Sequence, residues 1–245
     1  MDCFPRPPTL GRYMFHCEAH SVRTHDLLAI DANVFIAGNA SAPGWVEEAL
    51  RKTPFGVVRR GRTAAQEIPI GVRGAERNQR WPAFCHPTWL KSILTPPQLL
   101  TGTIPASRLD AAPALRALQI LKDRWMDLDH PWGPGGSVGF ELATGRHVVK
   151  PESDLDVVIY AEGKITIEQA RSLQARTTNL FVPVDIRVET LGCGFSLIEY
   201  ARGEAAGVLL RTPAGLELCD EPWSYEFSTE DKGRGVRERL NVPWA

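Results

Sequence analysis

The stretch GGSVGFELATGRHVVKPESDLDVVI, residues 135–159, constrains the fold more than any other part of the chain. It joins a glycine-serine turn to an apolar strand that carries Asp154 and Asp156. Successive side chains of a strand alternate between its faces, so both carboxylates point the same way. The residues between and after them are apolar, and a slip of one residue would bury both acids. Two like charges on one face repel unless a cation lies between them, which indicates a site for Mg²⁺.

A second short strand supplies a third carboxylate. In the segment FVPVDIRV, residues 181–188, Asp185 faces one way and its β-branched neighbours face the other. The three carboxylates converge if this strand lies beside the first. Between the glycine-serine turn and the acids, the spacing predicts a short helix over residues 138–144, ended by a glycine. Gly136 and Ser137 would then lie at a helix N-terminus, where backbone N–H groups favour phosphate.

This order of motifs resembles the nucleotidyltransferase fold of the polymerase β superfamily. The residues that carry the resemblance are GGS at 135–137, SDLDVVI at 153–159 and VDIRV at 184–188. The resemblance implies an α+β fold, with a mixed sheet flanked by helices and a smaller N-terminal α/β domain. It also implies that Asp154, Asp156 and Asp185 are catalytic and hold Mg²⁺, as two ions. The alternative interpretation, an edge strand with two exposed acids, leaves the glycine-serine turn unexplained.

Composition limits the classes of partner. The chain has 245 residues and a formal net charge of −1. A nearly neutral protein has no overall electrostatic attraction for nucleic acid, so we expect no nucleic-acid partner. Five widely spaced cysteines without a Cys-x-x-Cys pair fit a reducing compartment. The sequence shows neither a long apolar run nor a signal peptide, so we expect a cytoplasmic protein without a membrane partner.

Basic residues concentrate in the first third of the chain. Arg59, Arg60 and Arg62 precede the segment IPIGVRGAERNQRW, residues 68–81. Arginine presents a planar fork that suits phosphate, so we predict that this segment binds a phosphorylated ligand or an acidic partner. The alternative is a solvated basic face. The residues that we assign to substrate binding are Arg73, Arg77, Arg80, Gly136, Ser137, Lys150 and Ser153.

The positions of proline and glycine, which interrupt helices and strands, predict the domain organisation. We expect a disordered extension (1–23), an N-terminal domain (24–94), a linker (95–109), a catalytic domain (110–225) and a C-terminal tail (226–245). Periodicity and capping signals predict helices over 45–51, 87–94, 110–127, 166–176 and 195–202. A strand is expected over 56–59 and a hairpin over 208–219.

The segments around these motifs resemble one particular family within the superfamily. They are HDLLAID, IPIGVRGAERNQRW, PWGPGGSVGFELATG, VDIRVE and LLRTPAGLELCDEPW, between about His25 and Trp223. Together they resemble the phosphoribosyl-dephospho-CoA transferases of bacterial malonate decarboxylase, also called its holo-acyl-carrier-protein synthases.

The resemblance implies a reaction. Members of that family take 2′-(5″-triphosphoribosyl)-3′-dephospho-CoA and attach its phosphoribosyl-dephospho-CoA group to a serine of the apo acyl-carrier subunit, releasing diphosphate. Lys150, on the loop before the acids, is placed to contact the leaving diphosphate, although a loop lysine is more often only solvated. Two alternatives remain open: a nucleotidyltransferase that modifies a small molecule with an NTP, and a non-catalytic nucleotide-binding module on the same fold.

Overall fold

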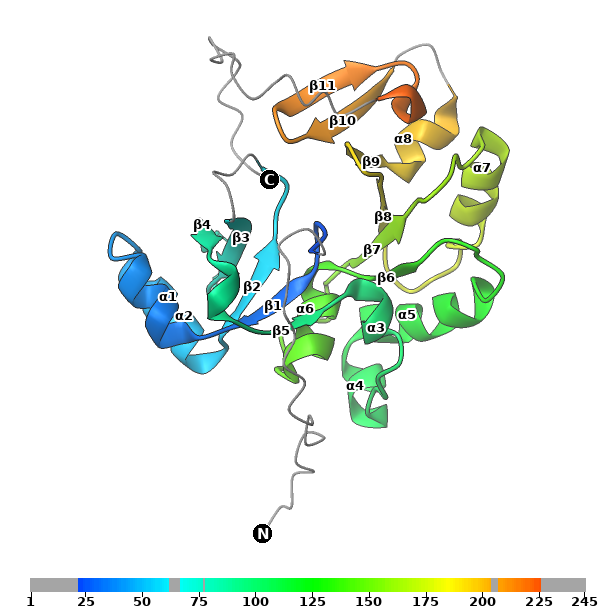
Figure 1. Cartoon of the computed structure of the whole chain (residues 1–245). Helices are drawn as coiled ribbons and strands as arrows, with labels where there is room; N and C mark the ends of the chain where they lie inside the picture. The colour runs from blue at the N-terminus through cyan, green and yellow to red at the C-terminus, as the bar shows by residue number, and fades with distance from the viewer. Residues whose placement is uncertain (1–21, 62–66, 77, 204–206, 226–245) are drawn as a thin grey trace.

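The structure, a computed structural model, describes residues 22–61, 67–76, 78–203 and 207–225. The predicted disordered extension lies outside these ranges except for Val22 and Arg23, and the predicted C-terminal tail lies outside them entirely. The described chain forms two sheets flanked by helices (Figure 1). The predicted α+β fold class is therefore confirmed. Within these ranges, no helix combines the length and the apolar character that a membrane span requires.

The first sheet is built from the N-terminal part of the chain and is antiparallel throughout. In spatial order its strands are β4 (Arg80–Cys85), β3 (Ile68–Arg73), β2 (Phe55–Val58), β1 (Leu27–Ile30) and β5 (Leu90–Leu94). Two helices, α1 (Ala32–Gly38) and α2 (Gly44–Lys52), follow β1 and cover one face of this sheet (Figure 1). The predicted helix over 45–51 corresponds to α2.

One predicted helix of this region is wrong. Residues 87–94 form a single 3-10 turn, Pro87–Trp89, and then strand β5, which pairs with β1. Ile93 packs on the helix-covered core, and Leu94 packs on the opposite side of the sheet. The apolar residues of β5, Leu90, Ile93 and Leu94, are three and four positions apart, so the sequence matches one face of a helix and conceals a strand.

The second sheet is mixed, as predicted. In spatial order its strands are β11 (Gly215–Cys219), β10 (Val208–Thr212), β9 (Gly194–Ser196), β8 (Val184–Glu189), β7 (Leu155–Tyr160) and β6 (Trp132–Pro134). Only β7 and β8 pair in parallel among these strands. A parallel pair needs a crossover connection, and here the chain between β7 and β8 carries helix α7 (Ile167–Ala175).

The larger core lies on the side of this sheet that α5 (Pro113–Arg124), α7 and α8 (Leu197–Arg202) cover. The predicted apolar stripe of α5 is buried, since Leu115, Leu118 and Leu121 are at most 1% exposed. The helix begins later than expected. Ala112 precedes a proline and is extended, which separates α5 from the short helix α4 (Ala106–Ala111).

Local signals in the C-terminal part are confirmed. Thr166 caps α7 through the predicted capping box with Gln169. Helix α8 ends at Gly203, which adopts the left-handed conformation expected of a helix end. The helix predicted over 195–202 begins two residues later than expected, because Gly194–Ser196 form strand β9. Strands β10 and β11 form the predicted hairpin, and a 3-10 turn, Pro222–Ser224, ends the described chain.

The two sheets face each other across a small third core. Helix α6 (Gly136–Thr144) lies between them (Figure 1), and its Phe140 packs against Leu27 of β1 and Leu99 of α3 (Pro96–Leu99). Both α3 and part of α4 lie in the stretch 95–109 that connects the sheets. The free face of the N-terminal sheet is thus directed at the second sheet, which places residues of both at one interface.

A buried carboxylate in this interface predicts a pH-dependent stability. Asp26 is fully buried and its Oδ1 has no hydrogen-bond partner among the described atoms, while Oδ2 accepts from the Arg23 N–H at 2.8 Å. Burial raises the pKa of Asp26 from 3.8 to about 6. The stabilising contribution of its protonated form is therefore present below pH 3.8 and is lost as the pH rises to about 6.

We expect Asp26→Asn to stabilise the protein at pH 8 by up to about 3 kcal/mol, with little effect at pH 4, because asparagine keeps the acceptor without the charge. Urea unfolding at both pH values measures the difference. Asp110→Asn, which removes an exposed carboxylate, is the matched control. An equal gain at both pH values, or a loss at pH 8, would contradict the assignment.

Candidate active site

Three carboxylates gather where the parallel strands β7 and β8 begin. Asp156 and Asp185 are direct partners in the register of the two strands, and Asp154 precedes β7 and is exposed. Leu155, Val157 and Ile159 are fully buried on the opposite face of the sheet, as predicted. The acids therefore lie on the face that is turned toward the N-terminal sheet.

On this face of the sheet, Asp156 lies close to two other negatively charged side chains. Burial raises the pKa of Asp156, and the negative charges of Asp154 and Asp185 raise it further. Arg73 and His25, both from the N-terminal part of the chain, act in the opposite direction. A group that brings positive charge to this position would relieve the repulsion, which is the requirement that a divalent cation meets.

The carboxylates are not arranged as a finished metal site. Among the described residues, no three His, Cys, Asp or Glu side chains form a cluster that could hold a metal ion as it stands. Asp185 is turned toward Arg187, whose Nη2 lies 2.9 Å from Oδ2. Asp154 and Asp156 offer the hard oxygen ligands that Mg²⁺ prefers, and Arg187 contacts only one of the two carboxylate oxygens of Asp185.

The glycine-serine turn lies directly on Asp156. The N–H of Gly135 donates to the backbone oxygen of Asp156 at 2.9 Å, and α6 begins at the next residue. Gly136 has a φ of +54°, and a Cβ added there would lie 1.7 Å from Oδ2 of Asp156. Ser137, half-buried, follows in the first turn of α6. The predicted helix, its end at Gly145 and its N-terminus beside the acids are all present.

The loop between α6 and the acids is fixed by a buried residue that the sequence analysis did not single out. Glu141 of α6 accepts from the N–H groups of Val148 and Val149, each at 2.8 Å, and from Nε of Arg108 at 2.7 Å. Burial acts to raise the pKa of Glu141, but these donors outweigh it and hold that pKa below its ordinary value. The long gap between the turn and the acids is therefore an ordered connection.

Two predicted binding residues lie on this loop. The hydroxyl of Ser153 accepts from the N–H of Lys150 at 3.0 Å and closes a turn just before Asp154. The Lys150 side chain is exposed. The structure thus gives Ser153 a local structural role, and the assignment of Lys150 to substrate binding stays a prediction.

The N-terminal sheet brings arginine to the acids. Arg73 ends β3, and burial lowers the pKa of its guanidinium group. The charge of Arg80 lowers it further, whereas Asp156 and Asp154 raise it, so Arg73 lies within electrostatic reach of both carboxylates. Arg80 is exposed and is the register partner of Arg73 on β4. Arg77, also predicted to bind substrate, lies outside the described residues.

Sequence reasoning missed the residues that join the two sheets. Arg60, which we grouped with the phosphate-binding arginines, instead pairs with Glu189 of β8, and His25 contacts the same carboxylate. Arg187 was missed as the partner of Asp185. Arg187 and Glu189 lie on the same strand face as Asp185, which is a signal in the sequence, whereas no local pattern marks Arg60 or His25.

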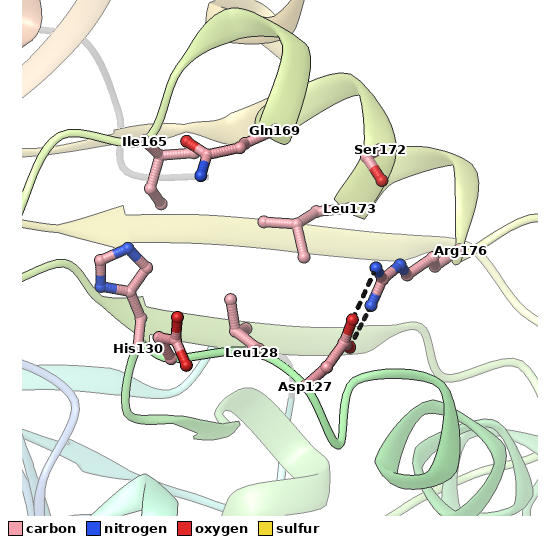
Figure 2. Close-up of a pocket in the computed structure, with 9 residues that line it drawn as sticks. Asp127, Leu128, His130, Ile165, Gln169, Ser172, Leu173 and Arg176 are labelled. Carbon is pink, nitrogen blue, oxygen red and sulfur yellow. Dashed lines mark hydrogen bonds and ion pairs between the residues drawn. The ribbon is translucent and has the colours of Figure 1, made fainter.

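A surface pocket of about 220 Å³ lies elsewhere, between α7 and the segment that follows α5 (Figure 2). Arg176 and Asp127 form an ion pair at one side of it, and Leu128, Ile165 and Leu173 supply apolar lining. None of the predicted site residues lines this pocket. It is therefore separate from the face that carries the acids.

Comparison with known proteins agrees with this arrangement. Residues 23–96 match the phosphoribosyl-dephospho-CoA transferase MdcG N-terminal domain, and residues 101–222 match the C-terminal domain of the same family. A phosphoribosyl-dephospho-CoA transferase of Pseudomonas fluorescens is 35% identical over 200 residues, which are 82% of this chain and 93% of the relative.

Other bacteria supply relatives of similar identity. The Pseudomonas aeruginosa protein of the same name is 33% identical over 81% of this chain and 92% of its own length. The Klebsiella pneumoniae protein is 32% identical over 83% of this chain and 97% of its own length. No solved structure matches the chain. The two matched domains and the nearly full-length relatives show that the chain belongs to the phosphoribosyl-dephospho-CoA transferase family of enzymes.

Proposed function

We propose that this protein transfers the phosphoribosyl-dephospho-CoA group from 2′-(5″-triphosphoribosyl)-3′-dephospho-CoA to a serine of the apo acyl-carrier subunit of malonate decarboxylase, with release of diphosphate. The observation that carries the proposal is the meeting of Asp154, Asp156 and Asp185 with the N-terminus of α6, opposite Arg73. Membership of the transferase family supplies the identity of the donor.

Catalysis of this reaction depends on positioning of the reactants and stabilisation of charge more than on covalent catalysis. The serine oxygen must approach the α-phosphorus of the donor in line with the leaving diphosphate, and negative charge grows on that leaving group. In the proposal, the N–H groups of the first turn of α6 and the hydroxyl of Ser137 bind phosphate oxygens. Arg73 and Arg80 neutralise further phosphate charge from the opposite sheet.

The carboxylates have a separate task. Asp154 and Asp156 are the residues that would hold Mg²⁺, with Asp185 as a third ligand or as the acceptor of the serine proton. When bound, Mg²⁺ supplies positive charge to the triphosphate and lowers the pKa of a coordinated hydroxyl. Arg187 keeps the Asp185 carboxylate neutralised until the ligands arrive, since the two side chains pair at 2.9 Å.

Intact-protein mass spectrometry tests the proposal. The apo carrier subunit is incubated with this protein, the triphosphoribosyl donor and Mg²⁺, beside an Asp154→Asn reaction and a reaction with EDTA. The expected result is a mass gain equal to one phosphoribosyl-dephospho-CoA group in the first reaction alone. Absence of the gain, with a donor and a carrier that a known family member converts, would contradict the proposal and favour a small-molecule nucleotidyltransferase.

A further inference from the structure

Glu189 joins the N-terminal sheet to the catalytic sheet. It ends β8, and its side chain is only 7% exposed. Its Oε1 lies 2.9 Å from Nε2 of His25, and its Oε2 pairs with the guanidinium group of Arg60. The same guanidinium group also donates to the backbone oxygen of Gly192 at 3.3 Å. Two residues that are more than 120 positions away in sequence thus hold one buried carboxylate.

The absence of a side chain at Gly194 leaves space for the Glu189 carboxylate. A Cβ at Gly194, the register partner of Glu189 on β9, would lie 2.5 Å from Oε1. His25 reaches the carboxylate from a backbone with a φ of +76°, a conformation that costs energy in a residue other than glycine. Structure that is maintained at such a cost indicates a specific requirement for the contact.

A second contact lies beside the first. The hydroxyl of Tyr160, at the end of β7, donates to the backbone oxygen of Thr24 at 2.8 Å. The guanidinium carbon of Arg23 lies 4.4 Å from the centre of the same ring. Tyr160 and Glu189 are register partners, so residues 23–25 and Arg60 all dock at one end of the parallel strand pair.

Backbone hydrogen bonds connect the docked end to the strand that carries Arg73. The N–H of His25 donates to the backbone oxygen of Val58 at 2.9 Å, which ties it to β2, and Arg60 lies two residues after the end of β2. Strand β2 pairs with β3, and Arg73 ends β3. On the facing sheet, Asp185 and Glu189 lie on one strand and point to one face. The N-terminal sheet therefore contacts the second sheet at Glu189, and its Arg73 acts electrostatically on Asp154 and Asp156.

We propose that Glu189 is a positioning residue, which holds His25 and Arg60 so that Arg73 is presented to the phosphates of the ligand at Asp154 and Asp156. The inference rests on the proposed function in one respect, that Arg73 binds phosphate. A displacement of about 1 Å in a positioning group is enough to weaken a charged contact severely. Loss of the Glu189 charge also leaves Arg60 buried without its partner, which allows the sheet to shift.

Binding of Mg²⁺-tripolyphosphate, measured by titration calorimetry, tests the inference through a double-mutant cycle. The four proteins are the native protein, Arg73→Gln, Glu189→Gln and the double variant. We expect Glu189→Gln to weaken binding by about tenfold in the native background and by less than about twofold when Arg73 is already replaced. Such non-additivity shows that Glu189 acts through Arg73, and a merely structural role does not produce it.

Two further variants test whether the effect is specific to the Glu189 contact. Arg146→Gln removes another contact between the two parts of the chain, the donation from Arg146 to the backbone oxygen of Lys52 at 3.3 Å, and is expected to leave binding unchanged. His25→Asn keeps a residue that tolerates positive φ while shortening the reach to Glu189, and is expected to behave like Glu189→Gln. Thermal unfolding of each variant confirms that a folded protein is titrated.

The outcomes are distinct. Equal losses from Glu189→Gln in both backgrounds, no loss in either, or a native protein that does not bind tripolyphosphate would each overturn the positioning role. The titration contains no carrier protein. Failure to load the carrier, together with the expected cycle, therefore counts against the proposed function alone, whereas normal loading with an additive cycle counts against the positioning role alone.

Discussion

Asp156→Asn is expected to reduce transfer of the prosthetic group by at least about a thousandfold while the protein stays folded. Asp156 is half-buried, as is its register partner Asp185, whereas Asp154 is exposed. Its replacement removes a charge that faces the ligand phosphates and any ion that they carry. An amide keeps the shape of the side chain, so the loss reports the charge itself.

Stability of the variant separates chemistry from folding. The pKa of Asp156 is raised, mainly by burial, so near pH 7 its ionised form costs stability. The asparagine variant is therefore expected to unfold at a temperature no lower than that of the native protein. Asp123→Asn, on the exposed side of α5, is the matched control and is expected to keep full activity. Near-normal turnover of Asp156→Asn, or its unfolding at a lower temperature, would contradict this account.

Gly136→Ala is expected to lower transfer by about a hundredfold or more, because the added methyl group and Oδ2 of Asp156 cannot occupy the same space. Their separation would be 1.7 Å, far below contact distance, so either the turn or the carboxylate must move. The positive φ of Gly136 adds a backbone cost of about 1–2 kcal/mol. The kinetic constants of the variant and its thermal unfolding measure the two effects.

Gly145→Ala separates those effects, because Gly145 ends the same helix with a φ of +70° and has open space around its Cα. This control is expected to lose a similar amount of stability and to keep its activity. If Gly145→Ala loses as much activity as Gly136→Ala, backbone strain explains the result and the close approach to Asp156 does not.

The sheet face that carries Asp154, Asp156 and Asp185 could be predicted because its sequence signals are local. Alternation of apolar residues around Asp156 fixed its face, and the same pattern around Asp185 predicted the strand that pairs with it. Helix α6 was predicted from the space between the glycine-serine turn and Gly145. These features depend on residues that are neighbours in sequence, where side-chain period and turn chemistry act directly.

The structural features that the sequence did not predict depend on contacts between residues that are distant in sequence. His25 and Glu189 are 164 positions apart, and no periodicity connects them. Strand β5 was mistaken for a helix because Leu90, Ile93 and Leu94 are spaced three and four positions apart, as on one face of a helix. Glu141 was overlooked because its partners are backbone N–H groups of a loop and the side chain of Arg108, 33 positions away, and no sequence period connects them.

Strand β8 carries Asp185 at one end and Glu189 at the other, and both must point to the same face. Insertion or deletion of a single residue between them would reverse the face of one and carry a charge into the core. The length of this strand is therefore fixed in any descendant of the protein that keeps both groups. The tip of the β10–β11 hairpin, between Thr212 and Gly215, bears no such constraint and is the place where this sheet tolerates a change of length.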